Sequence, residues 1–300
     1  MKKIPKPVQL FLKIAVTVAC LWYVSGKIDF AKAGIALKNA NWLYLLLALL
    51  LFIISKLISS FRLNIYFRNI NIRLPEWQNI KLYWLGMFYN LFLPGSISGD
   101  AYKVIVLTKK FNVPYKKTAA AVLLDRFSGL LGLGLILAVY SVIVLDNRLY
   151  VAGIISGAIV AVAGLYFIIR NWFKDFISSF ISTLFLGFLV QASQVVCAYL
   201  IMAALGIPAH VTEYIFIFLV SSVVAVLPLT IGGLGAREVV FLEGSKYFGL
   251  IQENSVVISI LFYLITLFTS VWGLLYIYKD PLKADSDTAL ARPSKHSPGF

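Results

Sequence analysis

Charged residues are scarce in this chain, and their scarcity limits what kind of protein it is. Only 13% of its 300 residues are Asp, Glu, Lys or Arg, whereas 60% are hydrophobic and the mean hydropathy is +0.88. Soluble domains contain about 25% charged and about 45–50% apolar residues. The composition therefore excludes an ordinary soluble domain and indicates an integral membrane protein.

Acidic residues are fewer than basic ones. The chain has 13 Asp and Glu residues against 27 Lys and Arg residues, which gives a net charge of +14. A nucleic-acid binder needs its basic residues clustered on a solvated face of a folded soluble domain. The sequence contains no such domain, so we expect no nucleic-acid partner.

Cysteine, histidine and the common catalytic motifs are also nearly absent. Cys20 and Cys197 both lie in apolar runs, so no structural disulfide is expected. His210 and His296 are far apart, and neither G-x-x-x-x-G-K-[ST] nor H-E-x-x-H occurs. These absences exclude P-loop hydrolysis and argue against a Ser-His-Asp or His-metal site. We therefore expect no catalytic residues, no metal and no cofactor.

Six apolar segments reach or approach the roughly 20 residues that cross a bilayer. They are residues 8–24, 42–60, 118–145, 150–169, 183–205 and 255–278. The first follows a basic start, but Leu21, Trp22 and Tyr23 stand where a signal peptide would have small cleavage-site residues. We interpret it as a retained first span. The polar tail, residues 279–300, is predicted to be disordered and cytoplasmic.

Two further apolar stretches are interrupted. Residues 82–93 run into LPGSISGDAYK, and residues 214–227 run into LPLTIGGLGARE. Proline removes a backbone donor and glycine adds backbone freedom, so neither stretch is a simple span. We predict that both are re-entrant broken helices, which gives an all-α membrane protein of about six transmembrane helices and two re-entrant elements.

The basic residues support this topology. With the N-terminus inside, 20 of the 27 fall in predicted cytoplasmic segments, including the cluster 103–117. A full crossing by residues 82–107 would move that cluster outside, against the positive-inside bias. We therefore predict a multi-pass protein of the cytoplasmic (inner) membrane with both termini in the cytoplasm.

The two broken segments also indicate an internal repeat. Both begin with Leu-Pro, have a hydroxyl two residues after the proline at Ser96 and Thr230, and have a small residue shortly before a base, Lys103 or Arg237. Each half would contain two spans, one re-entrant element and one span, as residues 8–145 and 150–278 of a single domain, 1–278. Three crossings per half make the second half inverted relative to the first, as in many secondary transporters.

Irregular backbone at membrane depth is tolerated where it is buried in protein or lines a watery cavity. Two broken segments entering from opposite faces would meet at the midplane, where free N–H groups at helix starts favour phosphate or carboxylate. The alternative is that the Pro and Gly residues only mark kinks or close helix packing.

Ionisable residues within membrane segments are functional hypotheses because their burial is costly. The leading candidates are Asp100 and Lys103 in the first motif and Arg237 and Glu238 in the second, with local ion pairing as the alternative. Asp125, Arg126 and Lys56 are further candidates, although Arg126 and Lys56 could instead snorkel towards the lipid headgroups. Gly129, Gly132 and Gly134 are expected to be helix-packing positions.

Three stretches resemble one family. NLFLPGSISGDAYKVIVL, AAAVLLDRFSGLLGL and LPLTIGGLGARE are similar to the lysylphosphatidylglycerol synthase transmembrane region, or flippase-like domain, over nearly the whole chain up to about residue 278. The resemblance implies a membrane domain that, in larger synthases, moves a modified phospholipid between leaflets. The soluble synthase domain is missing here, so we do not expect this chain to make lysylphosphatidylglycerol. The family pattern also has a base after the first LPG and one in the last span, where this chain has Ser96 and Ser98, and Tyr263.

Taken with the charges, the resemblance gives a set of predicted substrate-binding residues. They are Lys56, Asn90, Pro94, Gly95, Ser96, Ser98, Gly99, Asp100, Lys103, Asp125, Arg126, Pro228, Thr230, Gly232, Gly233, Gly235, Arg237 and Glu238.

The leading functional hypothesis is translocation of an anionic lipid or lipid-linked substrate. The partners would be membrane lipids, an anionic phospholipid or a polyprenyl-phosphate carrier, with a separate lipid-modifying enzyme as a further possible partner. An intramembrane lipid-linked transferase, with Asp100 or Asp125 as base, is one alternative. A membrane protein that does not transport but supports a separate glycosyltransferase or synthase is the other.

Overall fold

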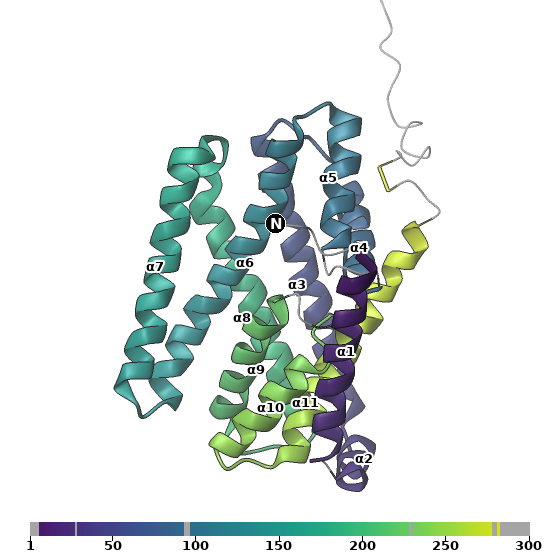
Figure 1. Ribbon diagram of the computed structural model, residues 1–300, viewed down its shortest axis with the longest axis vertical. Coiled ribbons are helices and arrows are strands. Elements are labelled where there is room, and N and C mark those ends of the chain that lie inside the picture. Colours follow the sequence, from purple (N-terminus) through teal and green to yellow (C-terminus); the bar gives the residue numbers. More distant parts are fainter. Residues whose placement is uncertain are drawn as a thin grey trace, which may run out of the picture.

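The computed structural model describes residues 6–27, 29–92, 97–227, 230, 232–277 and 281–282, and every regular element within these ranges is a helix (Figure 1). The helices are α1 (Lys6–Ser25), α2 (Phe30–Lys38), α3 (Trp42–Asn69), α4 (Glu76–Phe92), α5 (Ser98–Phe111), α6 (Tyr115–Val144), α7 (Arg148–Trp172), the 3-10 helix η1 (Lys174–Ser179), α8 (Phe180–Ala204), α9 (Val211–Val226), α10 (Ala236–Tyr247), α11 (Gln252–Val271) and the 3-10 helix η2 (Trp272–Tyr276).

Five of the described helical segments are long and apolar enough to cross a membrane: α3, α6, α7, η1 with α8, and α11 with η2. The predicted first span corresponds to α1, which has 20 residues. The prediction of an all-α membrane protein is confirmed. α9 is apolar but has only 16 residues, which is short for a full crossing.

The helix that contains the predicted span 42–60 is longer than the span and continues as α3 to Asn69. Beyond residue 60 it carries the polar residues Arg62 and Asn64, and both side chains are buried. Arg62 pairs with Asp125, and Asn64 donates to the Leu74 carbonyl at 3.1 Å.

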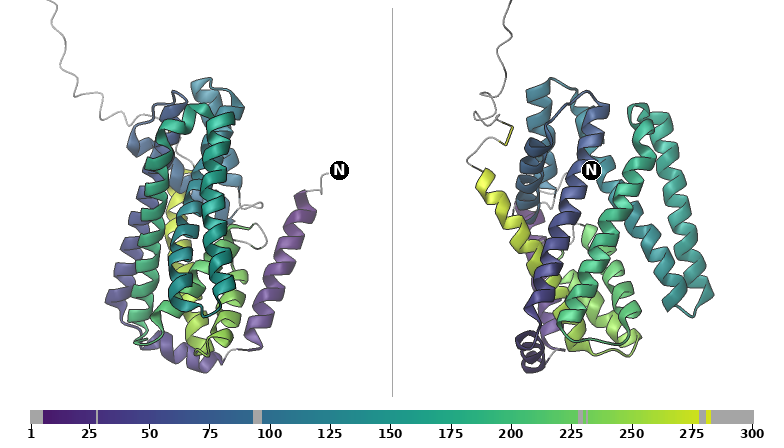
Figure 2. Two further views of the ribbon diagram at one scale, coloured as in Figure 1. Left: turned by 90° about the vertical axis from the view of Figure 1, so that its left-hand side faces the viewer. Right: turned by 180° about the vertical axis from the view of Figure 1, so that it is seen from behind.

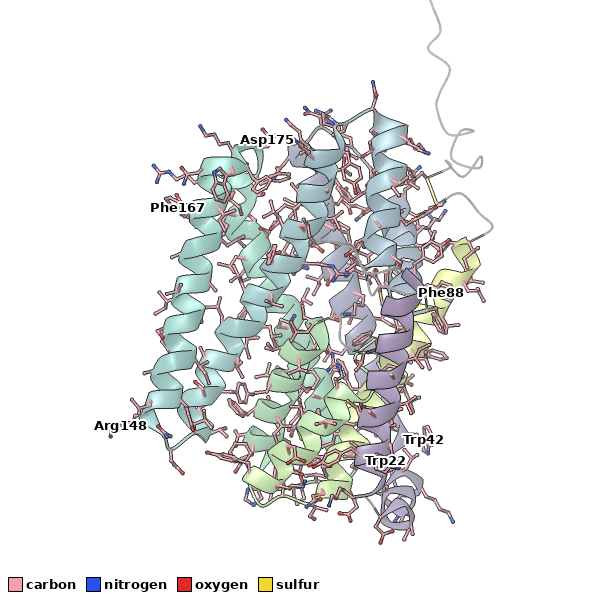
Figure 3. All side chains as sticks on the ribbon, in the orientation of Figure 1. Trp22, Trp42, Phe88, Arg148, Phe167 and Asp175 are labelled. Carbon is pink, nitrogen blue, oxygen red and sulfur yellow. The ribbon has the colours of Figure 1, made fainter. Side chains whose placement is uncertain are left out.

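The long helices run alternately along the longest axis of the molecule (Figure 1). We call the end with the α3–α4, α5–α6 and α7–α8 connections the upper end, and the opposite end, with α2, the lower end. In Figure 3, Asp175 lies at the upper end, Arg148 at the lower end, and Trp22 and Trp42 lie in the lower part. Figure 2 shows α1 leaning away from the other helices, and it packs chiefly against α10.

Basic residues are unevenly divided between the two ends. Those near upper-end connections are Arg68, Arg73, Lys109, Lys110, Lys116, Lys117, Arg170 and Lys174, and those near lower-end connections are Lys27, Lys38, Arg148 and Lys246. The predicted topology places the end with more basic residues in the cytoplasm. Which end faces the cytoplasm stays a prediction.

Each broken segment is a pair of short helices packed side by side. α4 and α5 form one hairpin in the upper half of the molecule, and α9 and α10 form the other in the lower half (Figure 1). The turning ends of both hairpins therefore point towards the middle of the bundle. The long helices α3, α6, α8 and α11 surround them.

Two apolar clusters hold the bundle together. The lower one joins α3, α8, α9 and α11 around Phe52, Phe218 and Phe262, whose rings meet edge to face. The upper one joins α3 to α6 and η1 around Tyr66 and Phe176. Between these clusters lies the polar region described next.

Candidate functional site

A polar cavity of about 340 Å³ lies between the two hairpins. Its lining includes the end of α4 and the start of α10, together with residues of α3, α6, α8, α9 and α11. The polar side chains in its lining include Lys56, Asn90, Arg126, Gln191, Ser222 and Arg237. Three of these six are cations, and no carboxylate is among the lining residues.

Two of the cations lack an acidic partner. Lys56 Nζ lies 4.5 Å from the centre of the Phe52 ring. Arg237 stands over the Phe262 ring at 5.1 Å, and its Nη1 donates to Ser222 Oγ at 3.3 Å. Within the described part of the chain, neither Lys56 nor Arg237 has a carboxylate within 4 Å. Ring faces and one hydroxyl leave both cations able to bind an anion.

The third cation, Arg126, belongs to an ion cluster. Its Nε contacts Asp100 Oδ2, and Lys103 Nζ contacts Asp100 Oδ1 at 3.2 Å. Lys103 is almost fully buried and lies 4.6 Å from the Tyr83 ring centre. Asp100 therefore neutralises charge behind the cavity wall, while the Arg126 side chain, 35% exposed, reaches the cavity.

The α4–α5 hairpin is closed by Asn90 and Gly99. Asn90 Oδ1 accepts the Gly99 backbone N–H at 2.9 Å, which satisfies a free donor in the first turn of α5. A Cβ at Gly99 would overlap the Gly86 carbonyl, so only glycine lets α4 and α5 approach this closely. Asn90 also donates from Nδ2 to Asp100 Oδ1 at 3.4 Å, and it lines the cavity.

The turn before α10 depends on three glycines with positive φ: Gly232 (+61°), Gly233 (+85°) and Gly235 (+83°). Other residues adopt this backbone region only with strain. Gly232 and Gly233 line the cavity. Glu238 does not line the cavity. Its Oε2 accepts a hydrogen bond from the Gly235 N–H at 2.6 Å, and its Oε1 accepts one from the Ser259 hydroxyl at 2.9 Å. Glu238 therefore holds the helix start in place.

The remaining predicted residues are placed as follows. Thr230 is buried, and its hydroxyl has no hydrogen-bond partner among the described residues. Ser98 begins α5 and does not line the cavity. Pro94, Gly95, Ser96 and Pro228 lie outside the described residues.

Asp125 does not line the cavity, and its ion-pair partner, Arg62, was not among the predicted site residues. Its Oδ1 accepts from Arg62 Nε at 2.7 Å, and both side chains are at most 10% exposed. The predicted topology counts Arg62 among the cytoplasmic bases, and in the structure its side chain is buried within α3. The sequence signal for it is weak: Arg62 follows the serine pair Ser59–Ser60 in a segment that stays helical.

Comparison with known proteins agrees with this architecture. The family described as the lysylphosphatidylglycerol synthase TM region matches residues 10–180 and 171–273. The chain belongs to this family. Membership confirms the resemblance carried by the three motifs, and together with the long apolar helices it supports a multi-pass membrane protein.

A curated relative covers a smaller part of the chain. A UPF0104 membrane protein of Pyrococcus horikoshii is 35% identical over 92 residues, which is 30% of this chain and 28% of the relative. The chain thus aligns with less than a third of that relative's length.

Proposed function

We propose that this member of the lysylphosphatidylglycerol synthase TM region family moves an anionic lipid or lipid-linked substrate between the leaflets of the cytoplasmic membrane. The observation that carries the proposal is the cavity between the hairpins, lined by Lys56, Arg126 and Arg237 without a carboxylate. Half-buried cations without a directly paired carboxylate, such as Lys56 and Arg237, are costly in a membrane, and an anionic ligand would offset that cost.

The membrane position follows the same reasoning. The hairpins would be re-entrant, entering from opposite faces and turning near the midplane, with the upper end in the cytoplasm. Residues 8–145 and 150–278 would be inverted repeats that rock about the cavity to give alternating access. The headgroup would occupy the cavity while the apolar chains stay among the lipids.

Acid-base chemistry has less support. A base must be free to take a proton from the substrate, but Asp100 is held by two cations and Asp125 is turned towards Arg62. Glu238 is committed to a backbone N–H and a hydroxyl. These contacts favour binding and movement over catalysis.

A leaflet-exchange assay tests the proposal. The purified protein is placed in phosphatidylcholine vesicles containing fluorescent phosphatidylglycerol or polyprenyl-phosphate, and outer-leaflet probe is quenched by an impermeant reductant. Wild type should exchange at least one anionic probe faster than a zwitterionic one. Because a hydrogen bond to a charged group contributes about 1.5–3 kcal/mol, Arg237→Gln should slow exchange roughly 10- to 100-fold.

The matched control is Arg68→Gln, which removes an exposed arginine on α3 far from the cavity lining. It should exchange lipid like the wild type. Equal rates for wild type, Arg237→Gln and empty vesicles under all gradients would contradict translocation. Product formation in detergent would then favour a transferase, and co-purification with a lipid-modifying enzyme would favour a partner role.

A further inference from the structure

The charges around the polar cavity do not balance. Five cations lie in its wall or directly behind it: Lys56, Arg62, Lys103, Arg126 and Arg237. Among the described residues, three carboxylates lie beside these cations: Asp100, Asp125 and Glu238. Both oxygens of Glu238 accept hydrogen bonds, as the oxygens of an ionised carboxylate do. Five cations against three carboxylates leave two positive charges without compensation.

Two half-buried cations without a directly paired carboxylate lie close together. Lys56 Nζ stands over the Phe52 ring, and the Arg237 guanidinium stands over the Phe262 ring. The centres of these two rings are 5.5 Å apart, so α3 and α10 bring their cations to the same part of the cavity. Lys56 is also within electrostatic reach of Arg237. Like charges repel more strongly in a medium of low dielectric constant than in water, so an anion between Lys56 and Arg237 is favoured in proportion to its charge.

The size of the excess distinguishes two kinds of phosphate headgroup. A phosphodiester carries one negative charge and would leave one positive charge uncompensated. A phosphomonoester carries close to two negative charges at neutral pH and has three terminal oxygens. The planar guanidinium of Arg237 suits two such oxygens, and the ammonium group of Lys56 acts as a point charge for the third. The pair therefore fits a phosphomonoester better than a phosphodiester.

An apolar groove of about 470 Å³ adjoins the cavity. It lies between α6 and α7, and Leu130 of α6 lines both the groove and the cavity. Leu123 and Phe127 also line the groove, and each is at least half exposed. Because α7 lies at the outer edge of the bundle (Figure 1, Figure 2), a groove beside it opens to lipid chains in a membrane. A ligand with its phosphate in the cavity has a place for a hydrocarbon chain next to it, which free phosphate would leave empty.

We propose that the cavity binds a lipid whose headgroup is a phosphomonoester and whose hydrocarbon chain lies in the α6–α7 groove. This rests on the proposed lipid translocation and narrows its substrate. The phosphate lies between Lys56 and Arg237, and its two charges offset the excess positive charge of the site. Arg126 keeps Asp100 as its partner. A phosphodiester lipid binds more weakly because one positive charge stays uncompensated.

The test compares two lipids that differ by one methyl group. Phosphatidic acid is a phosphomonoester, and phosphatidylmethanol is the corresponding phosphodiester. Both carry the same fluorophore on an acyl chain, and their exchange is measured at about pH 7.5, above the second pKa of a phosphomonoester. At a low probe fraction the rate follows kcat/KM. After subtraction of empty vesicles, wild type should exchange phosphatidic acid at least about 10-fold faster, the effect of one charge-assisted hydrogen bond.

Binding is measured separately from exchange. A lipid that binds the folded protein raises its melting temperature in detergent, so phosphatidic acid should raise it more than phosphatidylmethanol at the same concentration. Inorganic phosphate is the third probe, because it carries a similar charge without a hydrocarbon chain. It should raise the melting temperature less than phosphatidic acid does.

Lys56 tests the charge balance. Lys56→Gln leaves one excess positive charge and should bring the exchange rates of the two lipids close together, whereas Lys56→Arg keeps the charge and should keep the preference. Lys56→Gln removes a half-buried cation without a directly paired carboxylate, so without lipid it should melt no lower than the wild type. Arg68→Gln changes an exposed arginine outside the cavity lining and should keep the wild-type preference.

Glycines of α7 test the groove. Gly164 lines it, and a Cβ added there meets no atom within 4 Å, so Gly164→Leu places a side chain in the groove. A Cβ at Gly157 of the same helix is equally unobstructed, but Gly157 is not among the lining residues of the groove. Gly164→Leu should slow the exchange of phosphatidic acid, and the matched control Gly157→Leu should not.

Equal wild-type exchange of the two lipids, or a preference that survives Lys56→Gln, overturns the phosphomonoester headgroup while translocation stands. Inorganic phosphate that stabilises the protein as strongly as phosphatidic acid assigns the site to free phosphate and overturns the lipid. Unchanged exchange by Gly164→Leu overturns the position of the chain. Absence of any exchange overturns translocation. In that case a larger rise in melting temperature with phosphatidic acid upholds the phosphomonoester site, and equal rises overturn it as well.

Discussion

In the α4–α5 hairpin the carboxylate of Asp100 contacts two cations, whereas in the α9–α10 hairpin the carboxylate of Glu238 contacts a backbone N–H and a hydroxyl. In sequence, the first helix of each hairpin is followed by Leu-Pro, then by glycines and a nearby base. Their acidic residues nevertheless act differently, because Asp100 neutralises charge and Glu238 fixes a helix start.

The difference affects the positive charge at the cavity beside each hairpin, from Arg126 of α6 beside the first and from Arg237 of α10 in the second. Arg126 reaches the cavity already paired with Asp100, whereas Arg237 contacts Ser222 and the Phe262 ring and has no carboxylate within 4 Å among the described residues. An incoming anion must compete with Asp100 at Arg126 but with no directly paired carboxylate at Arg237. Arg237 should therefore contribute more to anion binding than Arg126.

The largest effect should come from removing the neutralising carboxylate. Asp100→Ala leaves Lys103 buried beside Arg126 with no counter-charge. Breaking a buried ion pair costs about 3–5 kcal/mol, and we expect about 3 kcal/mol because Arg126 reaches the cavity. The melting temperature in detergent measures the loss.

Asp100→Asn is the matched variant, because it keeps the acceptor for Arg126 and loses only the charge. It should be less destabilised than Asp100→Ala. If both variants melt with the wild type, then the carboxylate does not stabilise the first hairpin and the contrast with Glu238 is lost.

The α9–α10 hairpin should be destabilised by a substitution that leaves the ion pairs of Asp100 intact. Glu238→Gln is nearly isosteric, but its amide NH₂ cannot satisfy both the Gly235 N–H and the Ser259 hydroxyl. A buried donor left without a partner costs about 1–3 kcal/mol. We expect a lower melting temperature, with the anion preference of exchange unchanged.

Exchange measured at matched stability separates the two roles of Glu238. If Glu238→Gln keeps its stability but loses anion preference, Glu238 acts on the substrate and its role as a helix cap is wrong.

Much of the fold could be predicted from local sequence. Apolar length predicted six spans, five of which correspond to helices long and apolar enough to cross a membrane, and the Leu-Pro and glycine patterns found the broken segments whose ends line the cavity. These features depend on residues close together in the chain. For the same reason the motifs also brought out Asn90 and Arg237, and Lys56 was found as a charged residue within an apolar span.

The pairing of charges could not be predicted in this way. Arg62 is buried because Asp125, 63 residues away, neutralises it, and Glu238 is a cap because Ser259 lies beside it. Such partners are chosen by tertiary packing and leave no local periodic signal. The continuation of α3 past the apolar span 42–60 has the same origin.

A smaller effect should follow from crowding the first hairpin. Gly99→Ala places a Cβ against the Gly86 carbonyl, and overpacking costs about 1–3 kcal/mol. Gly134→Ala on α6 is the control, since no atom lies within 4 Å of its added Cβ. Alanine is favoured over glycine in a helix by about 1 kcal/mol, so Gly134→Ala should melt at or above the wild-type temperature. Equal melting of the two variants would show that close approach of α4 and α5 does not matter.

The smallest effect should come from an ion pair at the base of the first hairpin. Arg68 and Glu76 are paired at 2.5 Å, but their side chains are 57% and 36% exposed. Exposed pairs contribute about 0–1 kcal/mol and are screened by salt. Arg68→Gln should therefore shift the melting temperature little, and by even less at high salt. The melting-temperature shift of Asp100→Ala should not change with salt, because the Asp100 ion cluster is shielded from solvent. A loss as large as that of Asp100→Ala would mean that burial does not explain the difference between the two ion pairs.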